Sequence, residues 1–171
     1  TDDEGSSVAD AFFESNGIAL LLPFIKFEYY RKVFKESIWC LAALAQSGSK
    51  HTKMISEWLA DLISNFKDPE TLPKDFRLYL ETIEHTWVCL IFIFHHEPNL
   101  ILQLAGKVNF SYLTQLVRYK RESLSIITWL LINIIITNYP EYIPSFLENG
   151  LVSDLIYGVK SNQRIAWEVM N

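Results

Sequence analysis

Tryptophan recurs along this chain at an almost regular interval. Four of its five tryptophans stand at positions 39, 87, 129 and 167, so the intervals are 48, 42 and 38 residues. Each of the four lies in a stretch whose apolar residues follow the spacing of a helix. A rare residue that returns about every forty positions in a helical setting is typical of a repeat architecture.

A second marker gives the same period independently of tryptophan. The stretch Phe13-Glu14-Ser15-Asn16-Gly17-Ile18 is echoed by Phe146-Leu147-Glu148-Asn149-Gly150-Leu151, 133 residues later. Over three units this interval is about 44 residues per unit, close to the tryptophan interval. Asn-Gly is also a helix stop, because glycine after the last turn can take a positive φ. The two markers therefore predict repeated units joined at the same kind of corner.

The apolar pattern predicts helices throughout and no strand, so the expected fold class is all-α. Residues 1–10 are polar and acidic, and we expect them to form a disordered leader. The units are expected at about 11–48, 49–96, 97–138 and 139–171, the last one truncated. The expected helices are Ala11–Glu14, Ile18–Ile25, Val33–Ala45, His51–Phe66, Phe76–His96, Leu100–Ala105, Phe110–Arg118, Glu122–Asn138, Tyr142–Leu147, Leu151–Val159 and one that begins at Gln163.

Charge and hydropathy exclude several classes of function. The net charge of −5 argues against bulk binding to nucleic acid phosphates or to anionic lipid, and it suits a basic peptide partner. The uncharged stretch Ser123–Tyr139 has 17 residues, which is short of a membrane span and predicts a buried helix. Cys40 and Cys89 both lie in apolar helical runs, so we expect two buried thiols and a reducing compartment.

Neither catalysis nor a metal site is predicted. The chain has no glycine-rich phosphate loop, no nucleophile elbow and no catalytic Cys–His signature, so we expect neither an enzyme nor a cofactor. His85, Cys89 and His96 share one helical stripe. However, seven residues separate Cys89 from His96, which is roughly 10 Å along a helix. One ion cannot reach both with ligand bonds of about 2.0–2.3 Å, so no metal is expected.

The pattern of a unit resembles the armadillo repeat. A short helix is followed by Gly-Ile or Gly-Leu opening an apolar second helix, and then by Glu-x-x-Trp-x-Leu in a third. Residues 14–21 (Glu-Ser-Asn-Gly-Ile-Ala-Leu-Leu) and 34–45 (Phe-Lys-Glu-Ser-Ile-Trp-Cys-Leu-Ala-Ala-Leu-Ala) carry the resemblance. It covers most of the chain and implies a right-handed superhelical solenoid. The alternative is the HEAT repeat, with two helices per unit.

A tryptophan in every third helix is a pattern that most resembles the importin-α family. That family pairs each tryptophan with an asparagine one turn later on a peptide-binding face. Trp129 with Asn133 and Trp167 with Asn171 match Trp-x-x-x-Asn, whereas Trp39 and Trp87 are followed by Ala43 and Ile91. The acidic position that the family places eight residues after a tryptophan is occupied by Ser47, His95 and Thr137. The resemblance implies recognition of an extended basic peptide and nuclear import, hence the cytoplasm or nucleus. It makes Trp39, Trp87, Trp129, Asn133, Trp167 and Asn171 candidate peptide-binding residues.

Two interpretations of the tryptophans remain open at this point. They can form a ladder in an adaptor, because an indole face attracts a lysine and an asparagine amide hydrogen-bonds a peptide backbone. Alternatively they fill the space between stacked helices of a structural scaffold module within a larger complex. The two interpretations differ in whether Trp129 and Asn133 are exposed.

Overall fold

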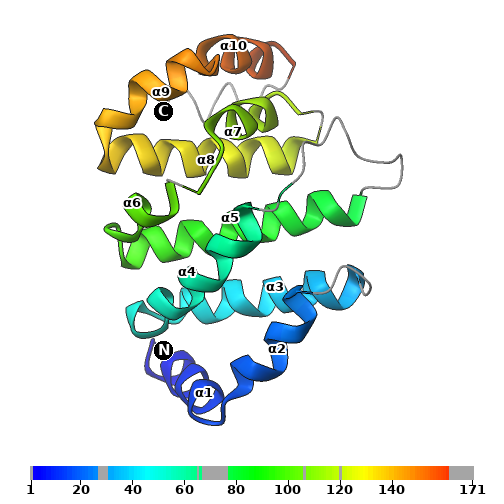
Figure 1. The fold of residues 1–171 in the computed structure, drawn as a ribbon, viewed down its shortest axis with the longest axis vertical. Coiled ribbons are helices and arrows are strands. Elements are labelled where there is room, and N and C mark those ends of the chain that lie inside the picture. Colours follow the sequence, from blue (N-terminus) through cyan, green and yellow to red (C-terminus); the bar gives the residue numbers. More distant parts are fainter. Residues whose placement is uncertain are drawn as a thin grey trace. The chain divides into compact units, whose positions relative to one another are not determined.

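The computed structural model describes residues 2–26, 31–64, 66, 77–105, 107–119 and 121–161. Within these ranges every regular element is a helix and there is no strand, which confirms the all-α prediction. The chain divides into two compact units, residues 1–100 and 101–171 (Figure 1). No single described helix is both long and apolar enough to cross a membrane. Glu122–Asn138 and Pro140–Glu148, bent by 116° from one another, meet that criterion jointly by length and composition only.

The described residues of the first compact unit form five helices. Their bounds are α1 Asp2–Glu14, α2 Gly17–Lys26, α3 Arg31–Gln46, α4 Ser49–Ser64 and α5 Arg77–His96. The prediction of a disordered leader over residues 1–10 is wrong, because residues from Asp2 onward belong to α1. Helix α1 extends toward the N-terminus from the segment predicted at Ala11–Glu14, and Ala9, in this added part, is buried.

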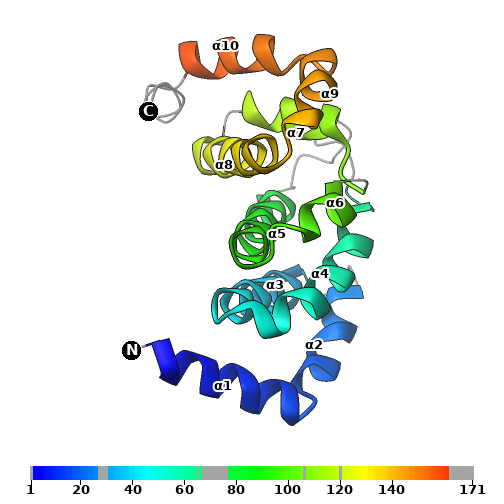
Figure 2. The ribbon, with the colours of Figure 1, turned by 90° about the vertical axis from the view of Figure 1, so that its left-hand side faces the viewer.

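The two long helices α3 and α5 run parallel and side by side (Figures 1 and 2). Near their N-terminal ends, the Lys35 ammonium lies 3.6 Å from a carboxylate oxygen of Glu81. At their C-terminal ends, Nε2 of His96 donates to the carbonyl oxygen of Gln46 at 3.3 Å. Because contacts join like ends with like, the two helices point in the same direction. This is how equivalent helices of consecutive repeats pack in a solenoid.

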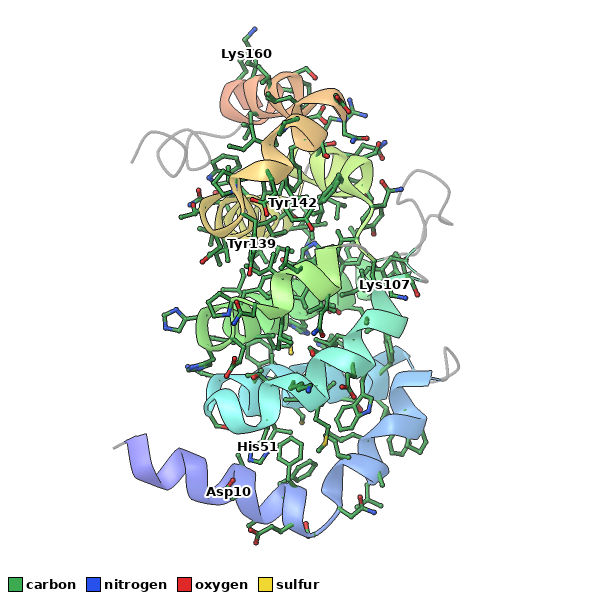
Figure 3. All side chains as sticks on the ribbon, turned by 60° about the vertical axis from the view of Figure 1, so that its left-hand side comes forward. Asp10, His51, Lys107, Tyr139, Tyr142 and Lys160 are labelled. Carbon is green, nitrogen blue, oxygen red and sulfur yellow. The ribbon has the colours of Figure 1, made fainter. Side chains whose placement is uncertain are left out.

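Helix α1 is fastened to α4 by His51. The Nε2 of His51 donates to Oδ1 of Asp10 at 2.8 Å, and its ring stacks on Phe13 with centroids 3.8 Å apart and planes at 10°. Figure 3 shows Asp10 and His51 facing one another between the two helices. His51 is buried, so both its polar and its apolar surfaces are used in this contact. A charge-assisted hydrogen bond and a stacked ring together fix α1 against the core.

The corner between α1 and α2 differs in detail from the prediction. Asn16, not Gly17, takes the positive φ, at 58°. Asparagine tolerates this left-handed conformation better than most residues. Gly17 is needed for a different reason: a Cβ at this position would lie 2.6 Å from the Phe12 ring. In the matching corner before α10, Gly150 itself has a positive φ of 89°. The repeated Asn-Gly pair therefore turns the chain in two different ways.

The second compact unit contains the remaining helices. Their bounds are α6 Leu100–Ala105, α7 Phe110–Val117, α8 Glu122–Asn138, the 3₁₀ turn Pro140–Tyr142, α9 Ile143–Glu148 and α10 Leu151–Ser161. Asn109 caps α7 by accepting from the backbone N–H of Tyr112 at 3.3 Å. The Ser125 hydroxyl lies 2.6 Å from the carbonyl oxygen of Tyr119 and joins α8 to the end of the loop before it. A side-chain cap thus sets the start of α7, whereas Arg121, the N-cap residue of α8, makes no such cap.

Helix α10 is held to α7 through a buried carboxylate. Asp154 lies 3.4 Å from the guanidinium of Arg118, and the Thr114 hydroxyl donates across to the carbonyl oxygen of Asn149 at 2.9 Å. Burial raises the pKa of Asp154, an effect partly opposed by Arg118 and by hydrogen bonding to Thr114. These contacts satisfy polar groups that would otherwise be costly inside the unit.

The long helices bury the same four positions relative to their tryptophans. We call the positions one before, two after, three after and six after each tryptophan the spine positions. All twelve side chains at these positions are at most 2% exposed. They are Ile38, Leu41, Ala42 and Ala45 in α3; Thr86, Cys89, Leu90 and Ile93 in α5; and Thr128, Leu131, Ile132 and Ile135 in α8. Tryptophan therefore marks an equivalent place in each long helix.

Most predicted helices are present, and a few burial predictions are wrong. The apolar pattern of the sequence predicts Leu41, Leu131 and Ile134 to be nearly fully buried. Leu41 and Leu131 are, whereas Ile134, outside the spine positions, is only partly buried. Cys89 is buried, but Cys40 is exposed, which corrects the expectation of two buried thiols. Cys40 directly follows Trp39, on the side of α3 that is turned from the spine. The sequence also predicts a loop at Asp68–Lys74. This segment and the helix predicted from Gln163 lie outside the described residues.

Candidate functional site

The three described tryptophans of the series have different exposures. Trp39 is 50% exposed, Trp129 is intermediate and Trp87 is fully buried. Asn133, one turn after Trp129, is exposed. Trp167 and Asn171 lie outside the described residues. The predicted six-residue ladder is therefore reduced to Trp39, Trp129 and Asn133 within the described part of the chain.

Trp87 is a packing residue, which corrects its assignment as a peptide-binding residue. Its ring meets the edge of Phe66 at a centroid distance of 5.6 Å and an interplanar angle of 77°. Its buried Nε1 has no hydrogen-bond partner among the described residues. A side chain with no exposed surface cannot contact a peptide, so for this residue the packing interpretation holds.

Trp39 lies in a group of side chains on the outer edge of the α3–α5 pair. Its ring centroid is 4.8 Å from that of His85, with planes at 48°. One turn earlier on both helices, Lys35 lies 3.2 Å from Glu36 and 3.6 Å from Glu81. Positions four apart on a helix share a face, so Lys35 with Trp39 and Glu81 with His85 form two parallel rows. We call these five residues the Trp39 cluster.

The Trp39 cluster has an excess of negative charge. Lys35 is its single cation at neutral pH, against the carboxylates of Glu36 and Glu81. A hydrogen bond to Glu36 raises the pKa of Lys35, and Glu81 acts in the same direction, so this ammonium is already paired. Burial and the positive charge of Lys35 lower the pKa of His85, which is therefore neutral at neutral pH. A half-exposed indole beside unbalanced carboxylates is a chemical setting for a cationic side chain.

The second compact unit offers a smaller polar edge on α8. The side-chain oxygen of Asn133 lies 3.5 Å from the hydroxyl of Thr137, which places the two side chains on one exposed face. Trp129 stands one turn before Asn133 on this face. Within this unit, Trp129 and Asn133 thus share a surface as the spacing predicts.

The His85, Cys89 and His96 stripe forms no metal site. Cys89 occupies a spine position and is buried, whereas His85 lies against Trp39 and His96 reaches Gln46. Within the described ranges, no group of three or more histidine, cysteine, aspartate or glutamate side chains is placed to hold a metal ion. Burial raises the pKa of the Cys89 thiol, which disfavours the thiolate that would be required.

Comparisons with known proteins assign no family to the chain. No family model matches it, and neither the curated proteins nor the solved structures contain a match. The site must therefore be judged from its own chemistry.

Sequence reasoning missed three members of the Trp39 cluster. None of Lys35, Glu81 and His85 is given a peptide-binding role by the sequence patterns, and their proximity depends on how α3 lies against α5. A usable signal was nevertheless present, because Lys35 and Trp39 are four apart and so are Glu81 and His85. Two parallel helices packed side by side bring two such pairs together over one turn.

Proposed function

We propose that the chain is an armadillo-type solenoid that binds an extended basic peptide along the exposed edges of its long helices. It acts as an adaptor in the cytoplasm or nucleus and catalyses no reaction. The shared spine positions of α3, α5 and α8 support a repeated unit. The order of a first, a middle and a long helix, in α1–α3 and again in α6–α8, supports the armadillo type.

The observation that carries the binding proposal is the Trp39 cluster. A lysine or arginine of the peptide would lie over the exposed face of Trp39 and pair with the exposed carboxylate of Glu36. A cation on an exposed indole contributes about 0.5–1 kcal/mol, and more when it is desolvated. In the second compact unit, the exposed Asn133 of α8 would by itself hydrogen-bond a peptide backbone, which contributes about 0.5–1.5 kcal/mol.

The proposal is tested by calorimetric titration of a lysine-rich peptide into four proteins: the unaltered chain, Trp39→Ala, Asn133→Ala and Trp87→Phe. We expect Trp39→Ala to weaken binding by about 0.5–2 kcal/mol, and Asn133→Ala by about 0.5–1.5 kcal/mol. Trp87→Phe is the matched control, because it changes a series tryptophan that is fully buried. Equal affinities for all four proteins, or no binding to the unaltered chain, would reject the proposal.

A scaffold module within a larger complex is the second candidate function, and the second compact unit favours it. Helices α9 and α10 expose large apolar side chains at Ile143, Leu147, Val152, Ile156 and Tyr157. Apolar surface gathered on adjacent elements is typical of a face that another protein segment covers. A scaffold module would co-purify with the other proteins of its complex. It would bind the lysine-rich peptide no better than an acidic peptide of the same length.

A further inference from the structure

We propose that His85 makes cation binding at Trp39 dependent on pH, so that basic peptides bind this face near neutral pH and are released on acidification. The inference rests on the proposed function, because it concerns regulation of the same site. It requires only the first compact unit, in which every participating residue is described.

The geometry places the titratable ring directly against the binding surface. The centroids of His85 and Trp39 are 4.8 Å apart, so a charge on the imidazole would lie against the indole. A cation beside an aromatic ring is attracted by the same π electrons that a peptide lysine would use. Protonated His85 would thus compete for Trp39 from within the protein and would also repel an incoming cation.

The hydrogen-bonding of His85 fits only the neutral ring. Its Nδ1 is buried and has no partner among the described residues. Neutral imidazole can leave that nitrogen as an unprotonated acceptor, whereas imidazolium must carry a proton on both nitrogens. A buried N–H without an acceptor is costly. Protonation would therefore push the ring out of its present position and disturb the Trp39 face as well as charging it.

The charges around His85 act on its pKa in opposite directions, so burial has the largest effect on this pKa. From α3, Lys35 disfavours the protonated form and Glu36 favours it; from α5, Glu81 and Glu84 favour it. No charged group of the described residues of α4, the other long helix packed against α5, is among those that act on His85. The pKa of His85 is lowered in sum, first by burial and then by Lys35, so the group is neutral where binding is expected.

The experiment measures the affinity of one peptide at a series of pH values between about 7.5 and about 5, spanning the ordinary histidine range. The peptide contains only lysine and glycine and is acetylated and amidated, so its own charge stays constant. The proteins are the unaltered chain, His85→Gln, His85→Phe and His95→Gln. His85→Phe retains a ring against Trp39 without a titratable group. His95→Gln, at an exposed position on the same helix, is the matched control.

We expect the unaltered chain and His95→Gln to lose at least about threefold in affinity on acidification, as one added charge at several ångströms requires. Circular dichroism first shows which of the two His85 variants are folded. At least one folded His85 variant should keep a nearly constant affinity over the same pH series. If the peptide binds at neutral pH but all four proteins show the same pH dependence, the inference is wrong and the proposed function stands. If the unaltered chain does not bind at neutral pH, the proposed function itself fails.

Discussion

The ammonium of Lys35 lies 3.6 Å from the carboxylate of Glu81, although 46 residues separate them in the chain. Trp39 and His85 meet with the same separation. At this end of the α3–α5 pair, facing residues are therefore 46 positions apart, a shift of two residues relative to the 48-residue interval between Trp39 and Trp87. Because of this shift, the neighbour of the exposed tryptophan is a histidine and not the next tryptophan.

The spine positions predict where a truncation destabilises the fold. Leu131→Ala should lower the free energy of unfolding by about 2–5 kcal/mol, because Leu131 is fully buried in α8. Leu102→Ala, the same change at a position 48% exposed in the same compact unit, should alter it by less than about 0.5 kcal/mol. Urea unfolding followed by circular dichroism measures both. A loss below about 1 kcal/mol for Leu131→Ala would contradict the role of the spine.

The two thiols should react at very different rates. Cys40 is exposed, whereas Cys89 is buried and burial raises its pKa, so little thiolate forms there. Brief treatment with iodoacetamide should add one label to the native protein and two after denaturation, as mass spectrometry would record. Cys40→Ser should abolish the rapid label. Rapid labelling of both thiols in the native state would show that α5 is not packed as described.

His51 should control the attachment of α1. His51→Ala removes the hydrogen bond to Asp10 and the stacked contact with Phe13, which together should stabilise the docked helix by about 1–3 kcal/mol. Hydrogen exchange should then become faster at the amides of residues 8–14, while α5 keeps its protection. His95→Ala, at an exposed position, should leave both regions unchanged. Unaltered exchange in α1 would mean that other contacts hold this helix.

Asp154 should make the second compact unit less stable as the pH rises. Its folded pKa is raised by burial above the ordinary value of 3.8, so the folded state binds its proton more tightly than the unfolded state. Stability from this group is therefore fully present below the unfolded pKa and is lost as the pH rises through the folded pKa. Asp154→Asn keeps the shape and cannot titrate. Urea midpoints of both proteins, measured between about pH 3.5 and 7, should show this fall in the unaltered chain only.

The helices could be predicted from sequence because they depend on local apolar spacing. Glu122–Asn138 is predicted with the same bounds as α8, and the spine residue Leu131 is correctly expected in the core. Exposure of individual ring faces depends on what lies opposite them. Phe66 covers Trp87, and no periodicity in α5 reveals this contact.

The candidate site could be predicted only in part, for the same physical reason. Trp129 and Asn133 share a face because one helix fixes their spacing. Lys35, Glu81 and His85 come together only when two helices pack with a given shift, which distant contacts determine. The role of Gly17 could not be predicted for the same reason. Glycine is required there because the Phe12 ring leaves no room for a Cβ, while Asn16 takes the positive φ.

Because α3 and α5 pack in parallel, their helix dipoles point the same way. Each helix carries a partial positive charge at its N-terminus and a partial negative charge at its C-terminus, and parallel neighbours add rather than cancel. The two negative ends therefore meet at the edge where His96 donates to Gln46. An extended chain lying across these helices would experience a field along the helix axes. Its long cationic side chains would be drawn toward the C-terminal edge.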